Sequence, residues 1–345
     1  METIRHLLPP VQQYFKANLH AHSNLSDGFL SPQELKDAYK AKGYSILCIT
    51  DHDVVVDHSP MNEADFLLLT GAEFDISEEG KLARHNSRHI KTYHLNCIAK
   101  CPDLLWQPFA NAQYREEILP YLEKAEVENM PRVYDVEAIN AIIARANEKG
   151  HLVAYNHPNW SLQDYTDYAG LKGLWAMEIS NYGSTMMGYY DIDNGVVYRD
   201  LMNLTGRIFP LATDDCHRVR NVGGGWIMVG AEKLEYGSVI QALEKGDFYA
   251  STGPEIRSLT IEGPLLRISC SDARQITIIC GNRHGRKAVP IHNDGLLREA
   301  EFDMSAWLDL CQGLPHDWLR IVVQGPYGHT ATTRAYTPDE LRPIG

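Results

Sequence analysis

The chain has 345 residues, of which 44% are hydrophobic, and this length allows two domains and a large core. Its 45 acidic and 32 basic residues give a net charge of −13, which argues against bulk binding of nucleic acid. No apolar run is long enough to span a membrane, and seven cysteines without a C-x-x-C pair indicate reduced thiols in the cytoplasm.

Seven apolar runs in the first two thirds of the chain predict buried β-strands. They cover residues 17–22, 44–50, 66–70, 93–99, 151–155, 174–179 and 207–212. Most of these runs carry histidine or carboxylate residues near one end. We therefore expect the strands to bring polar side chains together at one face of a sheet.

Helical signals lie between several of these runs. Ser31 is a typical N-cap, Pro32 stands at the first helical position, Glu34 completes a capping box, and Gly43 would end the helix. The segments 135–150 and 238–246 repeat this pattern. Strands that alternate with helices predict a parallel sheet, so we expect an α/β fold with a (β/α) barrel of about seven strands.

From about residue 255 the pattern changes to short alternating runs separated by turn residues. The runs cover residues 256–261, 265–270, 275–280, 318–323 and 329–336. They predict a small antiparallel β-sandwich. The expected domains are a barrel over residues 1–254 and an accessory β-sandwich over residues 255–345.

Histidine and carboxylate residues form short motifs at the ends of the predicted strands. In chain order the motifs are His20-Ala21-His22, Ser26-Asp27-Gly28, Thr50-Asp51-His52-Asp53, Gly71-Ala72-Glu73 and Asp214-Asp215-Cys216-His217, with His94 and His157 in or after further runs. Residues two apart on a strand face the same side, so one ion can take both His20 and His22. Imidazole and carboxylate bind Zn²⁺, Mn²⁺ and Fe²⁺. Nine good ligands predict two or three divalent ions, and such clusters hydrolyse phosphate esters.

The order of the motifs H-x-H, S-D-G, T-D-H-D, G-x-E, N-H-P and D-D-x-H resembles that of the PHP (polymerase and histidinol phosphatase) superfamily. The resemblance runs from about residue 15 to residue 254. It implies a distorted (β/α)7 barrel that holds up to three metal ions. The stretch from Gly225 to Pro254 is similar to the carbaryl-hydrolase branch of that superfamily, whose members often carry a β-rich C-terminal appendage.

The resemblance distributes the candidate ligands over three sites. The first ion would be held by His20, His22, Glu73 and Asp215. Glu73 would bridge to a second ion, which is also held by His94 and His157. The third ion would be held by Asp27, His52 and His217, with Asp27 standing where many relatives carry histidine. Glu178 either orients a ligand or is a buried carboxylate with a purely structural role.

The implied activity is hydrolysis of a phosphomonoester or phosphodiester of a small metabolite or nucleotide by a metal-bridging hydroxide. Three divalent ions would bring +6, whereas Glu73, Asp27, Asp215 and the hydroxide return −4, so the centre favours an anionic substrate. A metal-bound water or Asp53 would protonate the leaving alkoxide. The alternatives are a hydrolase of a carboxyl ester, amide or carbamate, and a barrel that serves only as a scaffold.

Arginine side chains near the motifs are candidates for binding a substrate phosphate. Arg84 and Arg88 lie in a polar loop before His94, where a guanidinium could hold phosphate through two parallel bonds. The alternative is a solvated basic loop, in which case Arg218, directly after His217, is the rival candidate.

Overall fold

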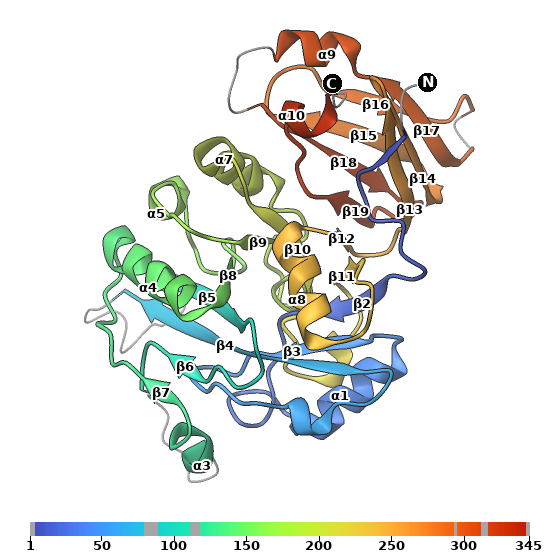
Figure 1. Cartoon of the computed structure of the whole chain (residues 1–345). Helices are drawn as coiled ribbons and strands as arrows, with labels where there is room; N and C mark the ends of the chain where they lie inside the picture. Colours follow the sequence, from blue (N-terminus) through green and yellow to red (C-terminus); the bar gives the residue numbers. More distant parts are fainter. Residues whose placement is uncertain (1–3, 79–88, 111–117, 293–294, 312–316, 343–345) are drawn as a thin grey trace.

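The computed structural model describes residues 4–78, 89–110, 118–292, 295–311 and 317–342. These residues form a mixed α/β fold around one large β-sheet, with two smaller sheets beside it (Figure 1). No helix in the described part of the chain combines the length and the apolar character needed to cross a membrane.

The large sheet uses strands from nearly the whole length of the chain. Its strands are β2 (Phe15–Asn18), β3 (Ile46–Ile49), β4 (Leu67–Ser77), β5 (Thr92–Ala99), β8 (His151–Tyr155), β9 (Ala176–Asn181), β10 (Phe209–Thr213), β11 (Trp226–Val229), β12 (Phe248–Ser251), β15 (Gln275–Cys280), β16 (Arg286–Ala288), β18 (Leu319–Gln324) and β19 (Thr330–Thr333). Within the described residues they pair in the order β10-β9-β8-β5-β4-β3-β2-β11-β12-β19-β18-β15-β16.

Each of the seven predicted strand runs contains or borders a strand, but the sheet is not fully parallel. β2, β3 and β4 pair in parallel, as do β8, β9 and β10, whereas β5 runs antiparallel to both of its neighbours. The prediction of a parallel sheet is therefore wrong at β5. The reason is that the Glu78 amide bonds the Lys91 carbonyl at 3.0 Å, so the chain turns back directly instead of crossing over the sheet.

The sheet curls until β10 lies against β11 and β12. No ladder of backbone hydrogen bonds joins β10 to either strand among the residues described, so the predicted closed barrel is not shown. What the structure shows is a large, curled α/β sheet.

The three predicted helices all form. They are α1 (Pro32–Ala41), α4 (Val136–Lys149) and α8 (Tyr236–Lys245), the last beginning two residues earlier than predicted. Ser31 accepts the Glu34 amide as the expected cap, and Gly150 and Gly246 end their helices at φ 96° and 75°, which favour glycine. The shorter helices are α3 (Leu119–Leu122), α5 (Tyr165–Tyr168), α6 (Tyr182–Met186), α7 (Gly195–Thr205), α9 (Ser305–Leu310) and α10 (Pro338–Leu341).

The smaller sheets lie at the two ends of the molecule. One contains β1 (Arg5–His6), β13 (Ile256–Glu262), β14 (Leu265–Ala273) and β17 (Leu297–Asp303), in the order β1-β13-β14-β17. The other pairs β6 (Trp106–Gln107) with β7 (Glu126–Val127). Buried side chains of β13 and β14 share one apolar cluster with side chains of β15 and β18. This packing is compatible with the predicted β-sandwich, which is not confirmed.

The predicted domain boundary at residue 254 crosses two strand pairings. β12 pairs with β19, and β1 at the start of the chain pairs with β13. The large sheet is therefore continuous across the boundary, and the division into residues 1–254 and 255–345 stays a prediction.

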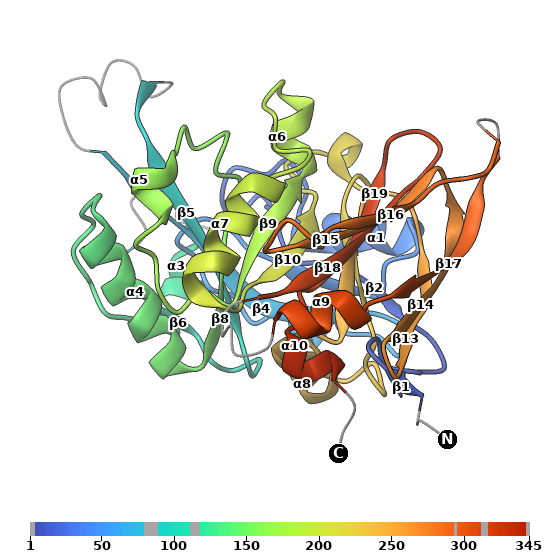
Figure 2. The same cartoon turned by 90° about the horizontal axis from the view of Figure 1, so that it is seen from above.

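Alternating strand directions place the ends of β2, β12 and β18 at one edge of the large sheet. β11 runs antiparallel to β2, β12 to β11, β19 to β12, and β18 to β19. Figure 2 shows the turn between β18 and β19 on the same side of the molecule as α6, which follows β9.

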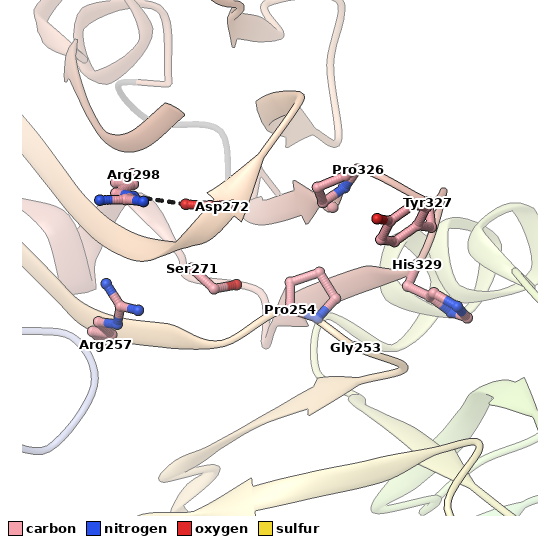
Figure 3. Close-up of a pocket in the computed structure, with 10 residues that line it drawn as sticks. Gly253, Pro254, Arg257, Ser271, Asp272, Arg298, Pro326, Tyr327 and His329 are labelled. Atoms are coloured by element: carbon pink, nitrogen blue, oxygen red, sulfur yellow. Dashed lines mark hydrogen bonds and ion pairs between the residues drawn. The ribbon is translucent and has the colours of Figure 1, made fainter. Parts of the chain in front are cut away.

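A pocket of about 610 Å³ opens at this edge, at the base of the β18–β19 turn (Figure 3). Pro254, Tyr327 and His329 form one side of it, and Arg257 and Arg298 form the other. Arg298 donates to Asp272 at 2.6 Å, so part of its charge is already balanced.

Trp318 joins the C-terminal strands to α7. Its side chain is 1% exposed, its indole Nε1 donates to Asn203 Oδ1 at 2.9 Å, and its ring meets Tyr198 edge-on with 6.2 Å between centroids. Trp318 thus belongs to the main apolar cluster although it lies beyond residue 255 in the chain.

We expect Trp318→Ala to lower the free energy of unfolding by about 3–5 kcal/mol, because it opens a cavity and leaves Asn203 without its donor. Chemical denaturation monitored by circular dichroism measures the change. Ile291→Ala, at a side chain that is 97% exposed, is the control and should be nearly neutral. Equal stability of the two variants would contradict the proposed joining role.

Candidate metal centre

The structure brings all nine candidate ligands together at the edge where β2 and β10 end. The residues are His20, His22, Asp27, His52, Glu73, His94, His157, Asp215 and His217. The H-x-H pair lies just past β2 and not within it, since β2 ends at Asn18. Ala21 still forms a parallel bridge with Cys216, which keeps the pair extended and sets it beside Asp215.

Glu73, in β4, stands at the middle of this cluster. Its carboxylate is 1% exposed and its two oxygens lie within 3.5 Å of five imidazoles. The distances are 3.0 Å to His94 Nδ1, 3.3 Å to His20 Nε2, His22 Nε2 and His157 Nε2, and 3.5 Å to His52 Nδ1. A carboxylate with neighbours on both oxygens is placed to bridge two ions.

Asp215 closes the cluster from the opposite side. Its Oδ1 lies 3.2 Å from His22 Nε2, 3.3 Å from His20 Nε2 and 3.6 Å from His217 Nδ1. Its backbone is held at φ 45°, a conformation that residues other than glycine seldom adopt.

The remaining ligands form an outer group that is more open to solvent. Asp27 Oδ2 lies 3.1 Å from His217 Nε2 and 3.8 Å from His52 Nε2, and Asp27 Oδ1 lies 3.5 Å from His22 Nδ1. The side chains of Asp27 and His217 are 46% and 32% exposed. His22 therefore faces both the inner and the outer groups.

The donor set fits divalent metal ions. Four combinations of these residues place ligand atoms within 4.8 Å of one another. Ligand atoms on a tetrahedral ion at about 2.0–2.1 Å lie about 3.4 Å apart, close to the separations described above. His22 Nδ1, His94 Nδ1 and Asp215 Oδ1 are buried and have no hydrogen-bond partner among the residues described, as expected of atoms whose lone pairs serve a metal.

The electrostatics of the cluster also call for cations. Burial alone would lower the pKa of His20, yet Asp215, Glu73 and Glu178 raise that pKa well above its usual value. Burial would likewise raise the pKa of Glu73, but His20 and His94 hold it well below its ordinary range. Anionic carboxylates are thus kept in the interior by positive charge, which metal ions can supply in place of protons.

Glu178, in β9, supports the ligands from behind. Its Oε1 accepts His20 Nδ1 and the Thr213 hydroxyl, both at 2.6 Å, and its Oε2 accepts the His157 amide at 2.9 Å. A carboxylate on Nδ1 fixes the tautomer of His20 and turns Nε2 toward the cluster. The orienting alternative for Glu178 therefore has direct structural support.

Two further carboxylates hold the loops that carry the ligands. Asp51 accepts the Ser23 amide at 2.7 Å and the Ser23 hydroxyl at 2.6 Å, next to His22. Asp214 accepts three successive backbone amides, those of residues 223–225, each at 2.8 Å. A side chain at Gly224 would clash with the Tyr182 ring at 1.9 Å, so this loop requires glycine.

Backbone strain gathers at the same place. Of the five described residues other than glycine with positive φ, three lie in the motifs: Asp53 at 54°, His157 at 22° and Asp215 at 45°. Such conformations cost about 1–3 kcal/mol each and persist where the surroundings enforce them, commonly at functional sites.

Asp53 is held by Arg132, a residue that sequence reasoning missed. The Asp53 carboxylate pairs with the Arg132 guanidinium, which also stacks on the Phe109 ring at 4.0 Å. Burial nevertheless raises the pKa of Asp53 to about 7. Nothing local marks Arg132 in the sequence, because it lies 79 positions away from its partner. The catalytic role of Asp53 stays a prediction.

The structure describes only one of the three arginines that are candidates for binding phosphate. Arg84 and Arg88 lie outside the described residues. Arg218 is exposed, and its guanidinium lies 4.2 Å from the centroid of the Phe29 ring, whose backbone amide bonds the His217 carbonyl. Arg218 thus stands at the rim of the outer group, and its substrate contact stays a prediction.

Comparison with known proteins finds a family match over part of the chain. Residues 18–171 match the PHP domain. The matched segment carries seven of the nine candidate ligands, whereas Asp215 and His217 follow it in the chain.

The chain is 30% identical over 177 residues to a 5'-3' exoribonuclease of Haemophilus influenzae, a match that covers 47% of this chain. It spans 61% of that relative's length. Among solved structures, a two-domain PHP-like protein from Bacteroides vulgatus is similar over 96% of this chain and 98% of its own, with 14% identity and a TM-score of 0.44. The endonuclease EndoQ from Pyrococcus furiosus is similar over 67% of this chain and 56% of its own, with 15% identity and a TM-score of 0.39.

These TM-scores lie below 0.5, so neither fold nor function is inferred from them. The matched segment and the motifs overlap. Seven of the candidate ligands, the six from His20 to His94 and His157, fall inside the matched segment. The similarity to the PHP domain thus covers residues 18–171, somewhat less than half of the chain.

Proposed function

We propose that this chain is a metal-dependent phosphoesterase that hydrolyses a phosphomonoester or phosphodiester of a small metabolite or nucleotide. The observation that carries the proposal is the convergence of nine histidine and carboxylate side chains around Glu73 and Asp215. In this proposal the two carboxylates and their imidazoles hold two or three ions of Mn, Zn or Fe. Bound divalent ions supply Lewis acidity and an activated water nucleophile at neutral pH.

The charge of such a centre selects an anionic ester. Three divalent ions bring +6, and Glu73, Asp215, Asp27 and a bound hydroxide return −4, so a centre with three ions stays positive. A phosphate group is attracted to it, whereas a neutral carboxyl ester gains much less.

The chain's own residues position the substrate and the proton. Asp53, next to His52 and held by Arg132, is the proposed proton donor to the leaving alkoxide. Arg218 at the rim, and Arg84 and Arg88 before His94, are the proposed contacts of the phosphate. Because the Haemophilus relative is a 5'-3' exoribonuclease, RNA is a further substrate to test.

A substrate panel tests the proposed function. Protein reconstituted with Mn²⁺ should hold more than one metal equivalent by elemental analysis. It should hydrolyse phosphate monoesters, diesters or a 5'-phosphorylated oligoribonucleotide, and leave aryl carboxyl esters and carbamates largely intact.

Turnover of the neutral esters alone would favour the alternative hydrolase, and full metal content without any turnover would favour the scaffold. One metal equivalent or fewer would contradict the multinuclear centre.

Glu73→Gln should lower kcat more than His217→Ala, by at least about 100-fold in the first variant, because Glu73 lies buried among five imidazoles whereas His217 belongs to the more exposed outer group. Steady-state kinetics on the best phosphate ester measure the difference. The exposed Glu299→Gln is the control for loss of one carboxylate charge. Similar residual activity in the Glu73 and His217 variants would contradict the bridging position of Glu73.

Glu178→Gln should weaken metal affinity about 10- to 100-fold, because an amide cannot fix His20 and accept the Thr213 hydroxyl as a carboxylate does. Titration of metal-stripped protein with Mn²⁺ measures the affinity. Thermal unfolding without metal separates the two possible roles, since a purely structural carboxylate would lower stability and leave metal affinity unchanged.

A further inference from the structure

Trp160 is a large aromatic residue that packs against the candidate metal centre. Its indole ring meets the imidazole of His94 edge-on at 5.2 Å between centroids, and that of His157 edge-on at 5.0 Å. The side chain is half-buried, and it belongs to none of the four apolar clusters that the described residues form. Contact with the candidate ligands, and not packing in the core, therefore accounts for its place in the structure.

Tyr189 extends the aromatic surface that Trp160 begins. Its ring lies 6.4 Å from the Trp160 ring, at an interplanar angle of 66°, and its side chain is also half-buried. Like Trp160, it lies outside the four apolar clusters of the described residues. Two neighbouring aromatic side chains that are open in part to solvent can cover a further flat ring and bury its apolar faces.

Hydrogen bonds fix the backbone on which Trp160 stands. The buried Asp191 carboxylate accepts the Asn159 amide at 3.1 Å and the Trp160 amide at 2.9 Å. The side-chain amide of Asn159 donates to the Tyr190 carbonyl at 3.0 Å, which ties the turn that carries Trp160 to the segment that carries Tyr189. A ring that is already fixed loses little conformational freedom when a ligand stacks on it, and this favours binding.

The position of Trp160 relative to the centre suits a nucleotide. His94 Nδ1 and His157 Nε2 lie 3.0 Å and 3.3 Å from the same carboxylate oxygen, Glu73 Oε1. One imidazole ring therefore separates the proposed position of the ions from the indole. In a nucleotide, one sugar ring separates the phosphate from the base. A phosphate group at the centre can thus have its base at Trp160.

We propose that Trp160, together with Tyr189, determines the substrate specificity of the centre by stacking on a planar aromatic ring of the substrate. The inference rests on the proposed phosphoesterase function. It narrows the substrate from phosphorylated metabolites in general to esters that carry such a ring, of which nucleotides are the biological example. Aromatic side chains stack on every nucleobase, so this surface selects for the presence of a base and not for its identity.

The test compares adenosine 5'-phosphate with ribose 5-phosphate, which differ by the base. Wild-type protein reconstituted with Mn²⁺ should have the higher kcat/KM for adenosine 5'-phosphate. Trp160→Leu should reduce this preference about 5- to 150-fold, mainly through KM, because stacking holds the base equally before and during the reaction. Trp160→Phe keeps a ring and should retain most of the preference. The methyl diesters of the two phosphates replace them if only diesters are turned over.

Tyr165→Leu is the matched control. It removes an exposed aromatic side chain whose ring meets that of Tyr168 at 5.8 Å, and the preference should stay as in the wild type. A Trp160 side chain that only shields the imidazoles of His94 and His157 would affect kcat for both esters alike. An unchanged preference in Trp160→Leu, or a wild type without any preference, would overturn the proposal.

Equilibrium dialysis of the metal-loaded protein against adenosine and against ribose gives a readout that needs no turnover. The wild type should bind adenosine more tightly than ribose, and Trp160→Leu should lose that difference. If Trp160→Leu folds poorly, Tyr189→Leu tests the other ring of the same surface and should also weaken adenosine binding. A wild type that hydrolyses neither ester would contradict the proposed function, and adenosine binding would still decide the role of Trp160. Equal binding of adenosine by the wild type and the folded variant would overturn that role.

Discussion

The Glu73 carboxylate is the constraint on which the centre depends. An anion that is 1% exposed needs compensation from every side, and here five imidazoles from four separate segments supply it. Each of those segments must therefore end at one place on the sheet. Because β4 lies between β3 and β5, Glu73 can reach His52 on one side and His94 on the other, and the strand order itself explains why this carboxylate serves both groups.

Buried carboxylates around the Glu73 cluster fix the segments that meet there. The oxygens of Glu178, Asp51 and Asp214 accept hydrogen bonds from backbone amides, hydroxyls or the His20 imidazole. These three carboxylates therefore surround the inner cluster and are not among its candidate ligands. Glu178 also accepts the His157 amide at 2.9 Å and so helps to hold that residue at φ 22°. The candidate ligands are therefore oriented by hydrogen bonds within the protein, an arrangement that favours metal binding.

Local pattern was enough to predict the strands, the principal helices and a set of candidate ligands that the structure brings together, because each of these depends on short-range spacing. His94 shows where that logic ends. It was expected on a parallel strand, yet it sits on antiparallel β5 and still reaches Glu73, since pairing with Asp75 sets its register. Strand direction, the pairing of β12 with β19 and the contact of Arg132 with Asp53 all join distant segments, and no local spacing encodes them.

The pairing of β12 with β19 has a consequence for synthesis of the chain. The strands through β12 leave the ribosome first, and the edge of β12 then waits for its partner, which begins at Thr330. The intervening stretch of about 80 residues takes about 4–16 s to translate at about 5–20 residues per second. During that interval an apolar strand presents unpaired amides and carbonyls to other chains. The strand is flanked by polar residues, Asp247 before it and Thr252 after it, and a charged flank disfavours pairing with another chain during this interval.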